Sequence, residues 1–426
     1  MTNYTFKRRL FLFCSVESSF RFLGMILIWF LLCWPGSAAA EEIDLSQALE
    51  KFYQNNYDIL ISRFEIDKSQ ADLVGAKLRP NPTFSVNYTG LDLQTPPVAN
   101  DNTQLTFRLD QLFELGGKRG HRTNQAQETL EASKLGHKDT IRTLLTGFYT
   151  FFFNLKLDSL NVELSQDELK RYDRSLTVAE KRFNAGHMSL VDYTKIKIGR
   201  IDLENNLTTT ETQLKNDQEQ FRFLIGSPKI VTPIVPVNEN LPVYGEDLLI
   251  PRALENRYDL LALQKQLKAA EFGQALAKAG RIPDLTVGAE YETFGAGSSP
   301  GIGLGISIPI PFFNRNQGDI LRKKAEYQQL ELQIQKLKKQ IEVDIRQALN
   351  NFSQSLRVLE AYKGRKSEMT DLLERSEKAF ALGGVTVLDW LDTQKTYRDF
   401  MNKFNQALVQ SNLNERLIKI YTGELK

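Results

Sequence analysis

The fold is set by residues 318–382, which read GDILRKKAEYQQLELQIQKLKKQIEVDIRQALNNFSQSLRVLEAYKGRKSEMTDLLERSEKAFAL. This stretch contains no proline and a single interior glycine, Gly364, so its backbone can form one unbroken helix. Apolar residues recur along it at steps of three and four, namely Leu330, Ile334, Leu337, Ile341, Ile345, Ala348, Phe352, Leu356 and Leu359. Leu330, Ile341 and Phe352 are eleven residues apart, and an eleven-residue repeat keeps an apolar stripe nearly straight, as helices standing side by side require. At 1.5 Å per residue this helix is about 98 Å long, so the molecule is predicted to be elongated.

Prolines divide the rest of the chain into two helical blocks. From residue 41 onward, prolines are confined to four zones, at 80–97, 228–251, 283 and 300–311. Residues 98–227 and 312–426 contain none. Because proline breaks helices and marks turns, two long helical blocks separated by punctuated zones are predicted.

The two blocks match each other at an offset of 197 residues. Residues 180–186 (EKRFNAG) align with residues 377–383 (EKAFALG), and Asp192 aligns with Asp389. The chain is therefore predicted to be an internal duplication. Its parts are a first repeat at 41–227, a proline-rich linker at 228–250 and a second repeat at 251–426.

Each repeat is predicted to begin with a helix and two strands. The helices, at 46–78 and 251–280, end at glycine or proline signals. Apolar residues then alternate with polar or small residues, which indicates four strands of about 9–10 residues, the length of an outer-membrane strand. These strands are expected at 82–90, 103–113, 284–294 and 301–312.

A long helix and a shorter returning helix are predicted to complete each repeat, within 118–224 and 318–422. Gly186 and Gly383 mark the turns, because glycine is favoured where a helix ends in a left-handed cap. An ordinary half-buried sheet remains the alternative for the strands, but two hairpins in an exported chain favour a membrane sheet. Four strands cannot close a membrane barrel and leave unpaired edges in lipid, so the chain is predicted to oligomerise.

The first 40 residues are predicted to be a secretory signal peptide. Basic residues precede an apolar run at 22–34, and the sequence AAA at 38–40 is typical of a cleavage site. The run is shorter than the roughly 20 residues that a spanning helix needs. Both cysteines, Cys14 and Cys33, lie in this segment, so the mature chain is expected to contain neither disulfides nor thiol ligands.

A lipoprotein acylated at Cys33 is the alternative to simple cleavage. Leu32 stands before this cysteine, where a small residue would be needed. Cleavage after Ala40 without a lipid is therefore expected.

Charge and histidine content exclude two classes of function. Beyond residue 40 the chain carries 50 lysines and arginines and 51 acidic residues, so a nucleic-acid partner is not expected. The histidines, His121, His137 and His187, are scattered, which argues against a histidine-built metal site. No cofactor or enzymatic activity is predicted.

Asp389 and Asp392 are the most interesting acidic residues. They lie three apart after Gly383, which places two carboxylates on one helix face at a predicted turn. A role facing a pore is predicted for both. The alternative is that Asp389 caps the returning helix or that both residues face water on the outer wall.

The duplicated arrangement of strands, long helix, turn and helix resembles the TolC-type outer-membrane efflux channels. Residues 182–186 (RFNAG) and 380–383 (FALG) resemble the periplasmic tips of that family. Residues 111–119 (QLFELGGKR) and 308–320 (IPIPFFNRNQGDI) resemble its heavy-metal branch, which exports cobalt, zinc, cadmium and copper.

The resemblance implies a homotrimer in the outer membrane, with a twelve-stranded β-barrel in lipid and an α-helical tunnel in the periplasm. It implies two partners, a periplasmic membrane-fusion adaptor and an inner-membrane proton-driven pump. Asp192 matches an acid of the gate, and Asp389 and Asp392 match acidic rings at the tunnel entrance. Phe183, Gly186, Phe380, Gly383 and Val385 belong to the tip turns. Phe380 and Val385 stand where the best-known member has a gating tyrosine and arginine, so that bonding network is not expected.

The predicted function is a passive exit duct of a tripartite efflux system, expelling heavy-metal cations from the periplasm. An outer-membrane channel for drug efflux or type I protein secretion is the alternative within the class. A trimeric coiled-coil adhesin would share the long helices, but an adhesin carries its strands at one terminus and does not duplicate them.

Overall fold

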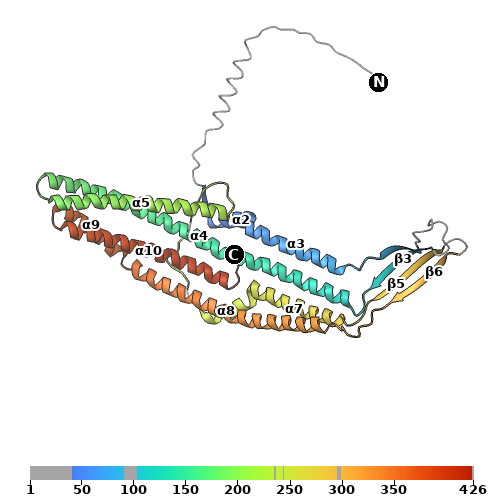
Figure 1. Cartoon of the computed structure of the whole chain (residues 1–426). Coiled ribbons are helices and arrows are strands. Elements are labelled where there is room, and N and C mark those ends of the chain that lie inside the picture. The colour runs from blue at the N-terminus through green and yellow to red at the C-terminus, as the bar shows by residue number, and fades with distance from the viewer. Residues whose placement is uncertain (1–40, 91–102, 235–236, 243, 295–298, 425–426) are drawn as a thin grey trace, which may run out of the picture.

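The computed structural model describes residues 41–90, 103–234, 237–242, 244–294 and 299–424. The predicted signal peptide and the loop at 91–102 lie outside this set. The described chain is a long helical rod with a small sheet at one end (Figure 1). The elongated shape predicted from residues 318–382 is confirmed.

The elements follow the same order in both halves of the chain. The helices are α2 Leu45–Asn55, α3 Tyr57–Lys77, α4 Lys118–Asn184, α5 Leu190–Leu224, α6 Glu246–Asn256, α7 Tyr258–Ala279, α8 Gln317–Lys363, α9 Lys366–Leu382 and α10 Val387–Tyr421. The strands are β1 Glu41–Asp44, β2 Thr83–Thr89, β3 Gln104–Phe113, β4 Val231–Ile234, β5 Leu285–Phe294 and β6 Gly301–Ser307.

The long helix of the first repeat, α4, runs unbroken over 67 residues, but its counterpart does not. The prediction of one helix over 318–382 is wrong, because the chain leaves the helix at Gly364 and Arg365 and restarts as α9. Arg365 has φ −115° and ψ 4°, which is not a helical conformation. The predicted apolar stripe is confirmed, since Ile341, Ile345 and Phe352 are all buried. A glycine within a helix costs about 1 kcal/mol relative to alanine, which makes this position the weakest in the stretch.

The shorter helices predicted at 46–78 and 251–280 are each broken in two. Asn56 and Arg257 adopt extended backbone angles, and Asn56 caps α3 by accepting a hydrogen bond from the Ile59 amide at 3.1 Å. Its side-chain amide also donates to the Leu224 carbonyl oxygen at 2.9 Å. Arg257 is held by Asp259 and by Asp344, at 2.6 and 2.8 Å. Both breaks depend on partners far away in the sequence, and at each break a buried polar residue stands on the inward face of the helix.

The expected linker at 228–250 contains regular structure. β4 pairs in parallel with β1, and α6 already begins at Glu246, so Pro251 lies inside that helix rather than at its start. The side chain of Asn412 on α10 accepts from the Asn238 amide at 2.8 Å and donates to the Asn238 carbonyl oxygen at 3.0 Å. These two bonds hold the middle of the linker against the helices.

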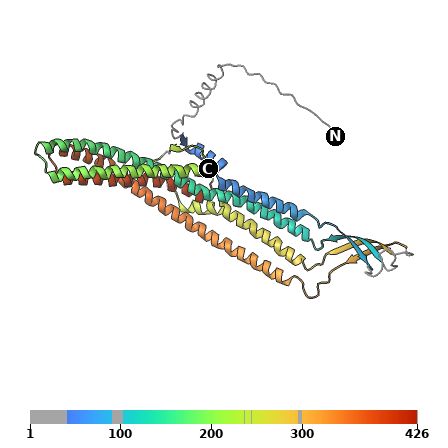
Figure 2. The ribbon, with the colours of Figure 1, turned by 45° about the horizontal axis from the view of Figure 1, so that its top comes forward.

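Helices α3, α4, α7 and α8 lie side by side in one layer that leads into the sheet (Figures 1 and 2). Toward the other end, α4 packs against α5 and α10, and α9 packs against α10. A buried aromatic cluster near the middle joins α2, α4 and α5 and contains Phe52, Phe148, Phe152 and Phe221. No helix among the described residues is both long and apolar enough to cross a bilayer.

The four-stranded sheet is antiparallel throughout, in the order β2-β3-β5-β6. One face is apolar and exposed, with Phe84 63%, Ile302 84% and Leu304 85% accessible. The other face is polar, and Arg108 on β3 forms ion pairs there with Asp110 at 2.8 Å and Glu290 at 3.0 Å.

The outer strands β2 and β6 have seven residues each, fewer than the 9–10 expected from the pattern. β6 stops at Ser307 because Pro309 and Pro311 cannot donate backbone hydrogen bonds to a ladder.

Candidate functional site at the helical tip

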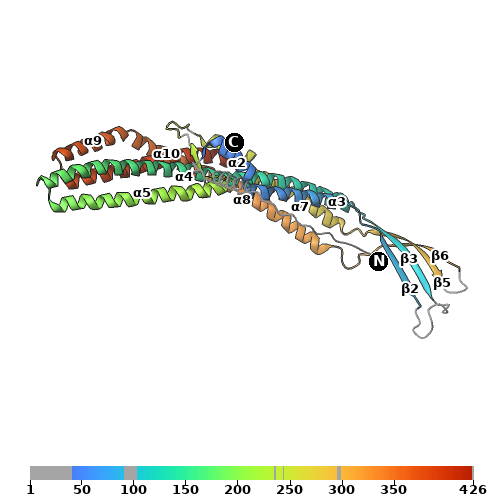
Figure 3. The same cartoon turned by 90° about the horizontal axis from the view of Figure 1, so that it is seen from above.

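The two helical turns lie together at the end of the rod opposite to the sheet (Figure 1). One turn joins α4 to α5 and the other joins α9 to α10. The same arrangement is visible when the molecule is seen from above (Figure 3). The predicted tip residues of both repeats therefore lie at one end of the molecule. They are Phe183, Gly186, Asp192, Phe380, Gly383, Val385, Asp389 and Asp392.

Both turns have the same backbone geometry. Gly186 and Gly383 have φ of 75° and 80°, in the left-handed region that glycine enters without steric cost. In the first turn the His187 amide donates to the Arg182 carbonyl oxygen at 2.8 Å. In the second turn the Gly384 amide donates to the Ala379 carbonyl oxygen at 2.8 Å. These bonds are the six-to-one bonds of Schellman caps, so the glycine signal read from the sequence identified both turns correctly.

The returning helices also begin in the same way. The hydroxyl groups of Ser189 and Thr386 accept hydrogen bonds from the backbone amides of Asp192 and Asp389, each at 3.1 Å. Each hydroxyl in turn donates to the carboxylate of the same aspartate, at 2.8 and 2.6 Å. Asp192 and Asp389 therefore occupy equivalent positions in two capping motifs. The helix dipole stabilises a negative charge at such a position.

The surroundings of the two aspartates differ in charge. The residue one turn after Asp192 is Lys195, whose ammonium lies 3.9 Å from the Asp192 carboxylate. The residue one turn after Asp389 is Asp392, and both of these side chains are exposed. The second repeat thus presents two carboxylates where the first presents a carboxylate and an ammonium. Asp389 takes part in a helix cap, as the alternative interpretation expected, and its carboxylate is still accessible to solvent.

A side-chain contact holds the two turns together. Arg182, at the end of α4, donates to the Phe380 carbonyl oxygen at 2.8 Å and lies over the Phe380 ring at 5.5 Å. Phe380 stacks on Trp390 with ring centroids 4.5 Å apart, and Trp390 contacts Tyr172 of α4 at 5.1 Å. Val385 is half-buried against the same cluster. Phe183 stacks on Tyr193 with ring centroids 4.8 Å apart, and Tyr193 packs against the same cluster.

Sequence reasoning assigned no role to Arg182, Tyr172 or Trp390 in joining the turns. Trp390 aligns with Tyr193 in the duplication, and an aromatic residue conserved in place between two repeats was the available signal. The arginine gave no signal of its own, because its partner is a backbone carbonyl group 198 residues away.

A buried carboxylate lies between α4 and α10, further from the tip. Glu168 is 3% exposed, and its Oε2 has no hydrogen-bond partner within the described structure. It lines a cavity of about 260 Å³ together with Ser165, Asn206 and Arg398. Burial raises the pKa of Glu168 to about 7, although Arg398 and Arg171 lower it.

A metal site built from side chains does not occur in the described part of the chain, where no three His, Cys, Asp or Glu residues group together. His137, for example, shares a hydrogen bond of 2.7 Å with the hydroxyl group of Ser62.

The family model described as "Outer membrane efflux protein" matches residues 48–227 and 249–422. The cobalt-zinc-cadmium resistance protein CzcC of Cupriavidus metallidurans is 27% identical over 66% of this chain and 66% of its own length. The pyoverdine export outer membrane protein OpmQ of Pseudomonas putida is 24% identical, over 91% of this chain and 86% of its own.

Two solved structures share the fold. Crystal structures of CusC superpose with a TM-score of 0.76 at 16% identity, over 89% of this chain and 91% of that one. The outer membrane protein VceC of Vibrio cholerae gives a TM-score of 0.73 at 17% identity, over 90% of this chain and 97% of that one. The family model covers far more than half of the chain, in two segments that each contain a sheet hairpin and a helical turn. The chain therefore belongs to the outer membrane efflux protein family, whose members are channels and not enzymes.

Proposed function

We propose that this protein is the trimeric exit duct of a tripartite efflux system and that it passively conducts heavy-metal cations out of the cell. One observation carries the proposal: a sheet with an apolar outer face lies at one end of a long helical rod, and exposed carboxylates lie at the other. The sheet end can enter a lipid layer while the tip reaches a partner in the periplasm.

The sheet supports the proposed assembly. β2 and β6 form its two edges in the single chain, and backbone groups at an edge cannot remain unpaired in lipid. Pairing β6 of one copy with β2 of the next closes a ring, and three copies provide twelve strands. The helical layer supports the same contact, because its outermost helices carry exposed apolar residues such as Ile61 and Phe64 on α3 and Leu321 on α8.

The cargo is argued from the tip. Three copies would bring six carboxylates of Asp389 and Asp392 to the entrance, and rings of carboxylates attract cations and repel anions. The relative named for cobalt, zinc and cadmium resistance supports a metal cargo. A periplasmic adaptor at the tip and a proton-driven pump in the inner membrane are the proposed partners, because a passive duct requires an energy source elsewhere.

Planar-bilayer recordings test the role of the tip. Asp389→Ala combined with Asp392→Ala should shift the reversal potential under a salt gradient toward zero and weaken block by di- or trivalent cations. Glu368→Ala combined with Asp371→Ala is the matched control, because these acids are also three apart but are paired with Arg365 and Arg375. Equal reversal potentials for the wild type and the tip variant would show that the tip carboxylates do not line the path.

Export of an organic compound is the second candidate, favoured by the pyoverdine-export relative that aligns with 91% of this chain. Deleting the gene should make cells more sensitive to cobalt, zinc, cadmium or copper if the cargo is a metal. Sensitivity to organic toxins alone, with unchanged metal tolerance, would favour this second function.

A further inference from the structure

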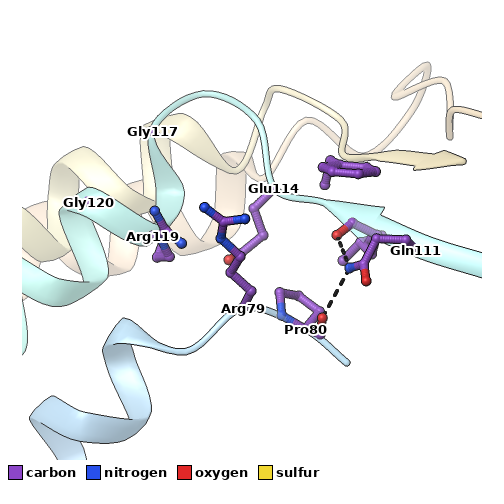
Figure 4. Close-up of a pocket in the computed structure, with 9 residues that line it drawn as sticks. Arg79, Pro80, Gln111, Glu114, Gly117, Arg119 and Gly120 are labelled. Atoms are coloured by element: carbon purple, nitrogen blue, oxygen red, sulfur yellow. Dashed lines mark hydrogen bonds between the residues drawn. The ribbon is translucent and has the colours of Figure 1, made fainter. Parts of the chain in front are cut away.

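A pocket of about 490 Å³ lies where the helices meet the sheet, between the end of α3 and the start of α4 (Figure 4). Its wall includes the rings of Pro80 and Phe113 and the side chains of Arg79 and Arg119. Gln111 braces this wall, because its side-chain amide donates to the Pro80 carbonyl oxygen at 3.1 Å (Figure 4). The pocket therefore offers apolar ring surfaces beside two guanidinium groups and the carboxylate of Glu114, which is already paired with Arg122 at 2.5 and 3.1 Å.

An exposed apolar segment follows β6 at the same level of the molecule. Residues 308–313 read IPIPFF, and Ile310, Phe312 and Phe313 are 83%, 71% and 86% exposed. The two phenylalanine rings contact each other edge to face at 5.1 Å. The alternating prolines restrict the backbone, so little conformational entropy would be lost when this segment binds a surface.

The direction of the strands determines which surface this segment meets. In the proposed ring, β6 of one copy runs antiparallel to β2 of the next, so Ser307 at the end of β6 lies level with Thr83 at the start of β2. The residues after Ser307 then face the residues before Thr83, and Arg79 and Pro80 in that stretch form one wall of the pocket.

We infer that Phe312 and Phe313 of one copy occupy this pocket in the next copy around the ring. The inference rests on the proposed trimer and adds a specific contact to it. An aromatic ring beside Arg79 or Arg119 gains a cation–π interaction, and contact with Pro80 and Phe113 removes apolar surface from water. Each copy contributes one aromatic pair and one pocket. Three equal contacts would therefore join neighbouring copies where the helices meet the barrel.

Cysteine cross-linking tests this contact in the full-length protein. Both natural cysteines lie in the first 40 residues, and Cys14→Ser with Cys33→Ser removes them if the segment is retained. Phe313→Cys is then combined with Gly120→Cys, which lines the pocket. The matched control pairs Phe313→Cys with Gly136→Cys, about 24 Å further along α4. A β-carbon at Gly120 or at Gly136 would meet no other atom within 4 Å, so both sites tolerate cysteine.

The detergent-extracted protein is treated with a short bismaleimide, and covalent trimer is measured on a denaturing gel. We expect at least tenfold more covalent trimer from the Gly120 pair than from the Gly136 pair. Light scattering on the same samples distinguishes a failure of this contact from a failure of the trimer. A trimer without the Gly120 cross-link would overturn the contact alone, and a monomer would overturn the trimer as well.

Lipid is the competing occupant of the aromatic segment. A bimane fluorophore attached to Phe313→Cys should be insensitive to brominated phospholipids if the pocket of the neighbouring copy covers it. Strong quenching in brominated vesicles would show that the segment lies in the bilayer interface, and would overturn the inference.

Discussion

At the scale of single residues, the tip depends on backbone angles that only glycine adopts easily. Gly383 has φ 80°, and a β-carbon added there would lie 3.3 Å from the Arg182 guanidinium group. The same guanidinium group bridges the two turns through the Phe380 carbonyl oxygen. One glycine therefore permits both the end of α9 and the contact that joins the repeats.

Gly383→Ala is expected to destabilise the protein by about 1–2 kcal/mol, because a left-handed conformation costs an alanine about that much. The thermal midpoint of the detergent-extracted protein should fall by several degrees. Gly384→Ala is the matched control, since its φ is not left-handed and its β-carbon would meet neighbours no closer than 3.5 Å. Equal midpoints for the two variants would contradict this account of the turn.

At the scale of helices, the long helices of the two repeats differ in continuity. α4 is continuous, whereas α8 and α9 are separated at Gly364 and Arg365. The first repeat thus reaches the tip as one helix, whereas the second reaches it as two helices joined at a non-helical residue. Glu168 lies on α4 and faces α10, so its ionisation acts at the contact between the two repeats.

Glu168→Gln is expected to change the dependence of stability on pH. Burial raises the pKa of Glu168 from 4.5 to about 7, so between these values the folded protein holds a proton that the unfolded chain has released. Stability must then decrease as pH rises from about 4.5 to about 7, by up to about 3 kcal/mol, and stay low above that range. The charged groups that face this carboxyl are Arg398, Arg171 and Asp399.

Thermal midpoints measured from pH 4.5 to pH 8 provide the check. Glu168→Gln should match the wild type near pH 4.5 and exceed it by several degrees at pH 8. Glu163→Gln on the exposed face of the same helix should follow the wild type throughout. A wild-type midpoint that rises steadily from pH 5 to pH 8, with no gain in the Glu168 variant, would rule out a buried neutral carboxyl.

At the scale of the whole molecule, a single chain leaves surfaces that only other copies can cover. The apolar face of the sheet, its two edges and the outer helices α3 and α8 are all open in one copy. A contiguous exposed apolar surface of this kind marks an interface with protein or lipid. The lipid can cover the face of the sheet, but it cannot satisfy the backbone groups at its edges.

The detergent-extracted protein is therefore expected to be a trimer. Light scattering with correction for bound detergent should give three times the mass of one chain. A monodisperse monomer that retains its strand signal in circular dichroism would refute a barrel shared among copies.

The sequence alone determined the features that depend on periodicity and on special backbone angles. The apolar stripe on α8, the duplication and the two turns at Gly186 and Gly383 follow from local physics, because spacing defines a helix face and glycine permits a left-handed cap. The family resemblance followed from the duplication, from the two tip segments and from residues 111–119 and 308–320.

Only the tertiary structure decided where helices break and which residues meet across the tip. Asn56 and Arg257 end helices through partners more than 80 residues away, and both are buried polar residues on the inward face of their helices. Arg182 finds the Phe380 carbonyl oxygen across the two repeats. Periodicity reports how each helix is oriented toward a neighbour, but hydrogen bonds between distant segments depend on how the neighbours are placed, and that placement is a property of the packed molecule.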